Sequence, residues 1–140
     1  MGAVSVCQIL ITPLKRIQVL GGDVLHGIKR SDPGYVDFGE AYFSIVEVGA
    51  IKAWKRHRRM TLNFIVPVGT VFFAFIDDEG MVREEIIGEN NYVRLTIPPS
   101  IWFGFKGVGK KNIVLNIASI PHNPDEVERL SLVDLDYVWS

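Results

Sequence analysis

The sequence predicts an all-β fold, either a sandwich or a barrel, from two observations. Turn signals made of Gly, Pro and Asp recur along the 140 residues, at the spacing of roughly 8–12 residues that is typical of such folds. The runs between them are short and rich in Val, Ile, Phe and Thr, which favour strands. No internal repeat or linker divides the chain, so residues 1–140 are expected to form a single domain.

Seven of these runs are the clearest strands. Their expected bounds are Ala41–Val48, Thr61–Val68, Thr70–Asp77, Met81–Ile87, Tyr92–Ile97, Ile101–Lys106 and Asn112–Ser119. Apolar and polar residues alternate from Tyr92 to Ile97. Since successive side chains of a strand point to opposite faces, Val93, Leu95 and Ile97 are expected on the buried face.

The turns and the N-terminal segment fit the same interpretation. Asp77–Gly80 is typical of a hairpin turn. Pro98–Pro99 cannot lie within a central strand and is expected to form a corner. The apolar run Val4–Thr12 predicts a buried N-terminal strand that carries Cys7.

Only Asp125–Leu130 looks helical. Asn123 can cap this segment, Pro124 suits the first turn, and acidic residues follow, as the helix dipole favours. This short C-terminal helix is expected to pack outside the barrel. The apolar segment Leu130–Ser140 is expected to dock on the body, with Trp139 as one of its contacts.

The charge balance and the cysteine count exclude several classes of protein. Fifteen Lys and Arg oppose sixteen Asp and Glu, for a net charge of −1, which gives no electrostatic footprint for nucleic acid or an anionic membrane. No apolar run approaches the roughly 18 residues of a membrane span. The single cysteine excludes an internal disulfide and a cysteine-based zinc site. We therefore expect a cytoplasmic protein without a nucleic-acid or membrane partner.

Three central segments resemble a known family. Residues 39–44 read Gly-Glu-Ala-Tyr-Phe-Ser, residues 49–61 read Gly-Ala-Ile-Lys-Ala-Trp-Lys-Arg-His-Arg-Arg-Met-Thr, and residues 97–105 read Ile-Pro-Pro-Ser-Ile-Trp-Phe-Gly-Phe. In order and spacing these segments resemble the dTDP-4-dehydrorhamnose 3,5-epimerase family of cupins and their sugar-nucleotide ketoisomerase relatives. The resemblance extends over residues 16–130.

The resemblance implies a fold, a ligand and a chemistry. The fold would be a cupin double-stranded β-helix, or jelly roll, in a homodimer whose N-terminal strands pack across to the partner. The ligand would be a nucleotide-linked 4-keto sugar in the barrel mouth, bound without a metal or other cofactor. Removal and return of a proton beside the ketone needs a base, an acid and a group that stabilises the enolate.

The chain departs from the epimerase pattern at positions that carry catalysis. Lys52-Ala53 looks like an arginine-glycine pair of the epimerases, and Lys55 then takes the place of their catalytic histidine. Phe103 takes the place of a second histidine, and Leu115 that of the proton-donating tyrosine.

The ketoisomerase relatives give a closer match at two positions. They carry two histidines, one residue apart, and an upstream tyrosine; here the first histidine is Lys55, the second is preserved as His57, and Tyr42 falls near the tyrosine. The candidate catalytic residues are therefore His57 and Tyr42, which match the ketoisomerase pattern, and Lys55, which takes the place of a histidine in it.

Strand geometry gives an independent argument for Lys55 and His57. Residues two apart on a strand share a face, so these two side chains point together with Ile51 and Ala53, whereas Lys52, Trp54 and Arg56 share the other face. If the first set lines the barrel, His57 is the general acid or base, and Lys55, with a reduced pKa, stabilises enolate or phosphate charge. The alternative is a solvated basic turn, because four of residues 55–59 are Lys or Arg.

Further polar and aromatic residues are candidates for ligand contact. Arginines suit bidentate phosphate contacts, aromatic rings can stack on a sugar or a base, and an amide in an apolar strand belongs either to a polar network or to a ligand site. The candidate substrate-binding residues are Lys52, Arg56, Arg59, Trp102, Lys106 and Asn116. No metal site is expected, because His57 has no second histidine or carboxylate at useful spacing.

Two main functions follow from these observations. The first is epimerisation or ketoisomerisation of a nucleotide-linked 4-keto-6-deoxy sugar. The second is a non-catalytic cupin that binds the nucleotide sugar but has lost the epimerase residues. A third is a purely structural partner in a sugar-modification complex.

Overall fold

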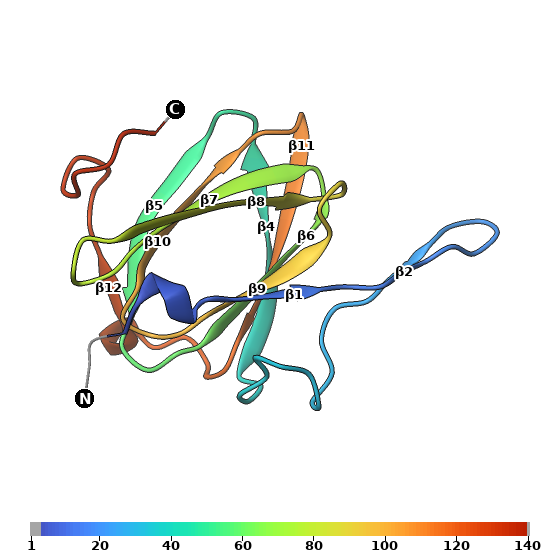
Figure 1. Ribbon diagram of the computed structural model, residues 1–140, viewed down its shortest axis with the longest axis horizontal. Helices are drawn as coiled ribbons and strands as arrows, with labels where there is room; N and C mark the ends of the chain where they lie inside the picture. The colour runs from blue at the N-terminus through green and yellow to red at the C-terminus, as the bar shows by residue number, and fades with distance from the viewer. Residues whose placement is uncertain (1–3, 140) are drawn as a thin grey trace.

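A computed structural model describes residues 4–139, which form two antiparallel sheets of five strands that face each other across a shared core (Figure 1). The first sheet has the strand order β1 (Leu10–Pro13), β9 (Val93–Ile97), β6 (Leu62–Val68), β11 (Lys111–Ala118), β4 (Glu40–Glu47). The second sheet has the order β12 (Val127–Arg129), β5 (Ile51–His57), β10 (Trp102–Gly107), β7 (Thr70–Ile76), β8 (Val82–Gly88). Sheet neighbours come from distant parts of the chain, as in a jelly roll.

The core lies between the two sheets and is rich in phenylalanine. The ring of Phe64 on β6 packs 5.2 Å from that of Phe73 on β7, measured between centroids. The three apolar residues predicted for the buried face of β9 belong to this cluster. All seven predicted strands are present, and none of their bounds differs by more than one residue. The prediction of an all-β fold is therefore confirmed.

The N-terminal segment differs from the single buried strand predicted for Val4–Thr12. It forms a 3-10 turn, η1 (Val6–Gln8), followed by the largely exposed strand β1. The side chain of Ser5 accepts a hydrogen bond from the Cys7 backbone N–H, and this capping stabilises a turn where an apolar run suggested extended chain. As a result Val6 is buried, whereas Cys7 is exposed and not a buried strand residue.

The predicted C-terminal helix is wrong. Within Asp125–Leu130 the structure has the end of a short 3-10 turn, η2 (Pro124–Glu126), and then the strand β12. The expected cap is present, since the Asn123 side chain accepts from the Asp125 backbone N–H. The turn stops because Val127 and the next two residues pair with β5, and these tertiary hydrogen bonds outweigh local helix propensity.

The rest of the C-terminal segment docks on the body, as predicted. The Trp139 ring lies 5.3 Å from the Trp54 ring, and the Tyr137 ring lies 5.5 Å from it, measured between centroids. Leu130 packs against the same cluster on the side of the second sheet that points away from the core. Ser140 lies outside the described residues.

Both predicted turns are confirmed. The carboxylate of Asp77 accepts hydrogen bonds from the backbone N–H groups of Glu79 and Met81 and so closes the β7–β8 hairpin. Gly80 in this turn has φ 80°, a conformation that glycine adopts readily. Pro98–Pro99 lies at the corner between β9 and β10.

A buried arginine fixes the loop at residues 26–34 on the first sheet. Arg94 is 0% exposed. Its guanidinium donates to the carbonyl oxygens of Gly27 and Pro33 at 2.8 and 2.6 Å, and to Asn63 Oδ1 at 3.1 Å. Asn63 therefore serves a structural polar network, one of the two roles open to an amide in an apolar strand.

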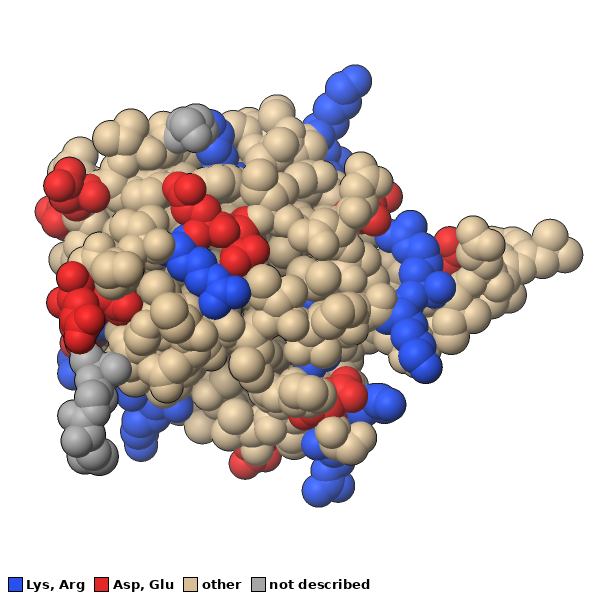
Figure 2. Space-filling model, in the orientation of Figure 1, with Lys and Arg blue, Asp and Glu red and all other residues tan. Residues whose placement is uncertain are grey.

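The surface has a mixed charge and one projecting feature. On the face shown in Figure 2, basic and acidic side chains are interspersed. The hairpin of β2 (Arg16–Ile17) and β3 (Val24–Leu25) extends away from the two sheets (Figure 1). Within residues 4–139, no helix is long and apolar enough to span a membrane.

Candidate active site

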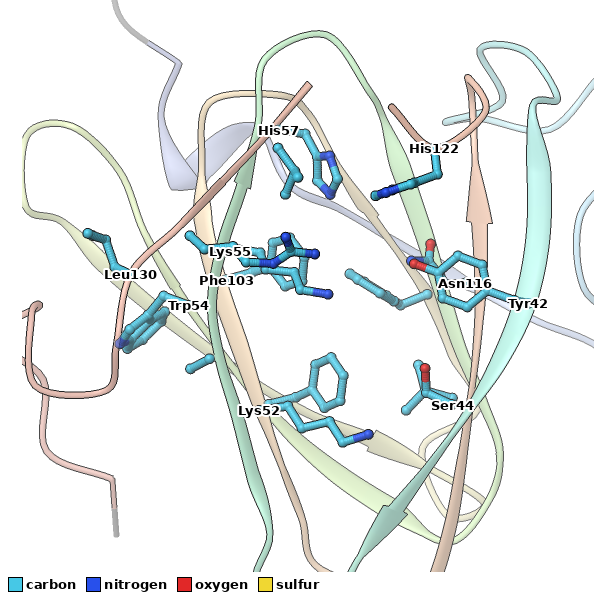
Figure 3. Close-up of a pocket in the computed structure, with 16 residues that line it drawn as sticks. Tyr42, Ser44, Lys52, Trp54, Lys55, His57, Phe103, Asn116, His122 and Leu130 are labelled. Carbon is cyan, nitrogen blue, oxygen red and sulfur yellow. The ribbon is translucent and has the colours of Figure 1, made fainter. Parts of the chain in front are cut away.

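A cavity of about 390 Å³ opens between the two sheets. One wall comes from β4 and β11 of the first sheet, and the opposite wall comes from β5 and β12 of the second sheet (Figure 3). Between the walls lie four apolar side chains, Phe64, Phe103, Phe105 and Val114. Polar groups therefore face each other across an apolar base, as in many ligand sites.

A bulge in β5 decides which of its side chains enter the cavity. In the pairing of β5 with β10, Lys55 lies opposite Phe103 and Ala53 lies opposite Gly104, so Trp54 is an extra residue. Such a bulge reverses the alternation of faces beyond it. Lys52 consequently points into the cavity with Lys55, and Trp54 points away from it (Figure 3).

This geometry confirms part of the prediction about which side chains of β5 line the barrel, and it corrects the rest. Lys55 and His57 both line the cavity, as predicted, and do not form a solvated turn. The prediction that Lys52 lies on the opposite face is wrong because the bulge shifts it to their side. Of the two residues expected beside Lys55, Ala53 is among the cavity-lining residues, whereas Ile51 is not.

His57 is paired with a buried carboxylate. Its Nδ1 lies 2.9 Å from Glu126 Oε1, and the Glu126 side chain is 1% exposed. Glu126 also accepts a hydrogen bond from the backbone N–H of Arg59 through Oε2, which fixes the carboxylate in place. When Nδ1–H donates to Glu126, the remaining ring nitrogen, Nε2, keeps its lone pair for a proton.

Burial shifts the pKa values of both basic groups on this wall. The pKa of His57 is lowered from its ordinary value mainly by burial, against an opposing effect of Glu126. The pKa of Lys55 is lowered by burial and then by the positive charges of Arg129 and Lys52. A neutral imidazole is the form of histidine that can accept a proton.

The opposite wall carries Tyr42 and Asn116. Strands β4 and β11 place these residues directly opposite each other, and Asn116 Nδ2 donates to Tyr42 Oη at 2.8 Å. Burial raises the pKa of Tyr42, although the hydrogen bond from Asn116 lowers it. The tyrosine is therefore protonated at neutral pH and able to donate.

The positions of Tyr42 and Leu115 complete the description of this wall. Tyr42 lies on β4, an edge strand of the first sheet. Leu115, at the position implied for the proton-donating tyrosine, does not line the cavity, whereas Val114 and Asn116 on either side of it do.

The cavity wall is positively charged. Lys52, Lys55 and Arg129 contribute cationic side chains, and none of the lining side chains in the described part of the chain is an Asp or Glu. Lys52 also donates from Nζ to the carbonyl oxygen of Ile45 at 3.3 Å, which directs it across the cavity towards β4. Such a site favours an anionic ligand.

Four predicted ligand-binding residues lie elsewhere. Arg56 pairs with Glu128 and Asp78 on the outer side of the second sheet, where its guanidinium lies 4.5 Å from the centroid of the Trp102 ring. Trp102 and Lys106 alternate with the cavity-lining Phe103 and Phe105 on β10, so they are on that outer side and not at the mouth.

Arg59 is the fourth of these residues. Its side chain is 73% exposed, and its Nε lies 3.9 Å from Glu126 Oε2. Arg59 is not among the cavity-lining residues. Its backbone, by contrast, holds the carboxylate that pairs with His57.

Sequence reasoning missed three polar residues near the cavity. His122 and Arg129 line it, and Glu126 pairs with His57 from behind. Glu126 and Arg129 belong to the segment for which a helix outside the barrel was predicted, and His122 precedes that segment. The sequence carried no local signal for Glu126, because its neighbours include the charged residues Asp125 and Glu128 and its burial is seen only in the structure.

A metal centre is not built by these side chains. Within residues 4–139 no group of three or more His, Cys, Asp or Glu side chains is placed to hold a metal ion. The polar groups instead define an acid–base site: a carboxylate-paired histidine and a protonated tyrosine on opposite walls, with cations between them. The class is therefore an all-β jelly roll with a cationic acid–base cavity.

This chain is similar in sequence and in structure to known proteins. The chain matches no protein-family model. It is 30% identical over 87 residues to the probable low-salt glycan biosynthesis epimerase Agl13 of Haloferax volcanii, a match that covers 57% of this chain and 56% of that protein. The match thus spans little more than half the length of this curated relative.

Solved structures extend the likeness to nearly the whole chain. A dTDP sugar isomerase from Desulfovibrio desulfuricans G20 is 34% identical with a TM-score of 0.90, covering 94% of this chain and 90% of that one. The sugar 3,4-ketoisomerase QdtA from Thermoanaerobacterium thermosaccharolyticum, solved with TDP, has a TM-score of 0.79 at 16% identity, covering 90% of each chain. The second likeness supports the fold alone.

The chain belongs to the dTDP-4-dehydrorhamnose 3,5-epimerase-like family of cupins, together with its sugar isomerase relatives. The family resemblance seen in the three central segments is thereby confirmed. The cupin fold is confirmed as well, apart from the C-terminal helix.

Proposed function

We propose that the protein is an enzyme that moves a proton beside the ketone of a nucleotide-linked 4-keto-6-deoxy sugar, as an epimerase or an isomerase. The observation that carries this proposal is the His57–Glu126 pair, which faces the protonated Tyr42 across a cationic cavity. Proton removal and return need a base and an acid at separate positions around the substrate carbon.

The proposed roles follow from the chemistry of each group. His57 Nε2 removes the proton from the carbon beside the ketone, and Glu126 stabilises the imidazolium that forms. Lys55 stabilises negative charge on the enolate oxygen, a contribution that is large in a site with little water. Tyr42 returns a proton from the other wall.

The diphosphate of the ligand fits the remaining cations. Lys52 and Arg129 line the same cavity as the acid–base groups, so an anionic nucleotide can be held while its sugar reaches His57. Relatives named for dTDP sugars and solved with TDP agree with this assignment. Arg56, Arg59, Trp102 and Lys106 have no part in this proposal, because they do not line the cavity.

Proton exchange tests the proposal directly. The purified protein is mixed with dTDP-4-keto-6-deoxyglucose in deuterated water, and the sugar protons are followed by proton NMR. We expect loss of the signal at C3 or C5, or a new keto-sugar product. Absence of exchange from a sugar nucleotide that demonstrably binds contradicts the enzymatic proposal.

A non-catalytic nucleotide-sugar-binding cupin is the alternative. It is favoured by Lys55 and Phe103, which stand where the family resemblance implies catalytic histidines. The same experiment separates the two functions, because a binder is stabilised against heat by the ligand without exchanging its protons.

We also propose that two copies of the chain form a homodimer. The edge strand β4 exposes Phe43 and Ile45, each 67% accessible, and apolar surface beside an unpaired strand edge is a usual site of association. Light scattering on the purified protein is expected to give twice the chain mass. A Phe43→Glu change is expected to halve it, whereas a monomeric parent protein contradicts the proposal.

We also propose that the protein is located in the cytoplasm, and this proposal depends on its single cysteine. Cys7, the only cysteine, is exposed and has no disulfide partner, which is typical of proteins in reducing compartments. Cell fractionation with an antibody against the chain tests it, and recovery in a secreted or membrane fraction contradicts it.

A further inference from the structure

Tyr42 and Asn116 form a side-chain pair whose direction is fixed by the first sheet. They are Cα partners in the antiparallel pairing of β4 and β11, and directly opposite residues of such strands project to the same side. Both side chains line the cavity and point towards each other in Figure 3. The amide nitrogen Nδ2 is 2.8 Å from the phenol oxygen.

The donor in this pair is the amide, and the acceptor is the phenol oxygen. A tyrosine hydroxyl has one proton to donate and can accept at its oxygen. Because Asn116 already donates to Oη, the proton of Tyr42 is directed away from the amide. The Tyr42 side chain lines the cavity, so a ligand bound there can accept that proton.

The oxygen of the same amide has no hydrogen-bond partner in the described part of the chain. Asn116 is 5% exposed, and its Oδ1 is buried without a hydrogen-bond partner among the described residues. Buried polar atoms of native proteins are nearly always paired. An unpaired acceptor in the wall of a ligand cavity is therefore satisfied when a donor on the ligand reaches it.

Together the two side chains present one donor and one acceptor to the cavity. A sugar with a ketone next to a hydroxyl-bearing carbon presents the complementary pair, an acceptor oxygen beside a donor oxygen. A hydroxyl group can donate or accept, so a diol can also satisfy the pair, whereas a ketone oxygen can only accept. An α-hydroxy ketone is therefore held in one orientation, with the ketone oxygen towards Tyr42 and the hydroxyl towards Asn116.

We propose that Asn116 is a specificity-determining and positioning residue: its nitrogen directs the Tyr42 proton into the cavity, and its oxygen accepts a hydrogen bond from the ligand hydroxyl beside the ketone. The direction of the Tyr42 proton depends on the protein alone. The identity of the ligand hydroxyl rests on the proposed function.

The first test needs no ligand. Tyrosine is labelled with ¹³C at Cζ, the Tyr42 signal is assigned from Tyr42→Phe, and its titration is compared among the parent protein, Asn116→Leu and Asn116→Asp. Loss of the amide donor is expected to raise the pKa of Tyr42 in the Leu variant. The Asp variant raises it further, because a carboxylate repels the phenolate. An unchanged or lowered pKa of Tyr42 in Asn116→Leu overturns the positioning role.

The second test measures recognition of the hydroxyl. Binding of dTDP-4-keto-6-deoxyglucose, its 3-deoxy analogue and dTDP alone is measured by calorimetry for the parent protein and Asn116→Leu. The change is expected to weaken the first ligand by about 10-fold, the usual scale of one buried hydrogen bond, and to leave the other two within about twofold. Equal weakening of all three ligands, or of none, overturns the specificity role.

The two tests separate this inference from the proposed function. A raised Tyr42 pKa with no binding of the keto sugar by the parent protein contradicts the proposed function and the hydroxyl contact, but supports the positioning role. Asn91→Leu removes an amide that donates to the Ile86 carbonyl on an exposed turn and is the matched control. Thermal unfolding of each variant shows whether it is folded.

Discussion

The two walls of the cavity differ in charge and in the way they are built. The β5–β12 wall carries Lys52, Lys55, His57 and Arg129, whereas the β4–β11 wall carries the neutral groups Tyr42, Ser44 and Asn116. One wall can bind an anion and take a proton, and the other can donate a proton and recognise a hydroxyl. A group that can accept a proton and a group that can donate one are thus held apart because they belong to different sheets.

Replacing His57, the proposed base, is expected to have the largest effect on the rate of proton exchange. His57→Gln removes the group that takes the proton, so deuterium exchange should fall by about 1,000-fold, within the range for general acid–base groups. Binding of dTDP should be retained, as calorimetry can show. His26→Gln, outside this cavity, is the control. If His57→Gln exchanges deuterium at the rate of the parent protein, His57 is not the base.

Replacing the acid tests the neutral wall. Tyr42→Phe keeps the ring but removes the donated proton, and turnover should fall by about 100-fold with little change in affinity for dTDP. The control is Tyr92→Phe, which removes a hydroxyl that donates to the His26 carbonyl. If the two variants lose equal activity, the neutral wall has no special role.

The carboxylate behind His57 is expected to have a smaller effect with a pH signature. Glu126→Gln leaves the imidazole less well oriented, and turnover should fall by about 10- to 100-fold. Because Glu126 raises the pKa of His57, its loss lowers that pKa and should move the acid limb of the pH–rate profile to lower pH. Glu128→Gln, in the neighbouring outward ion pairs, should leave the limb in place.

The same histidine links pH to stability. Its pKa in the folded protein is lowered from the ordinary 6.5, so between the two values the unfolded chain binds more protons than the folded one. The free energy of unfolding should therefore decrease as the pH falls through 6.5 and then through the folded pKa. Thermal unfolding measured over a series of pH values checks the direction of this change in stability. The His57→Gln variant should lack this part of the pH dependence.

The smallest effect is expected from one cation of the charged wall. Lys52→Met should weaken dTDP by about 10-fold, equivalent to about 1.4 kcal/mol, and less so at high salt because ions screen partly exposed charges. Arg56→Met, on the outer face of the same strand, is the matched control. Similar losses for both would show that binding depends on net charge and not on the wall.

Period-two alternation and turn chemistry were enough to predict the all-β class and seven strands, whereas the jelly roll was implied by the family resemblance. The seven strands are found within one residue of their predicted bounds, because their apolar faces and their Gly, Pro and Asp turns favour the same structure. The helix predicted for Asp125–Leu130 was wrong because part of this segment forms a strand that pairs with the open edge of β5. No local pattern reveals such an edge.

The site was predictable where the strand is regular. Lys55 and His57 are correctly placed together, as are Tyr42 and Asn116 in the cavity. Lys52 was misplaced because one bulged residue, Trp54, reverses the alternation. Glu126 was missed because 69 positions separate it from His57, and only tertiary structure brings them together.

That separation also sets an order of events during synthesis of the protein. His57 and the whole of β5 leave the ribosome long before the segment that supplies Glu126 and Arg129. Until β12 arrives, β5 has an unpaired edge and Trp54 lacks its cover of Tyr137 and Trp139. The nascent chain therefore completes this site only after β12 has emerged, and a chain that stops before Glu126 lacks the carboxylate partner of His57.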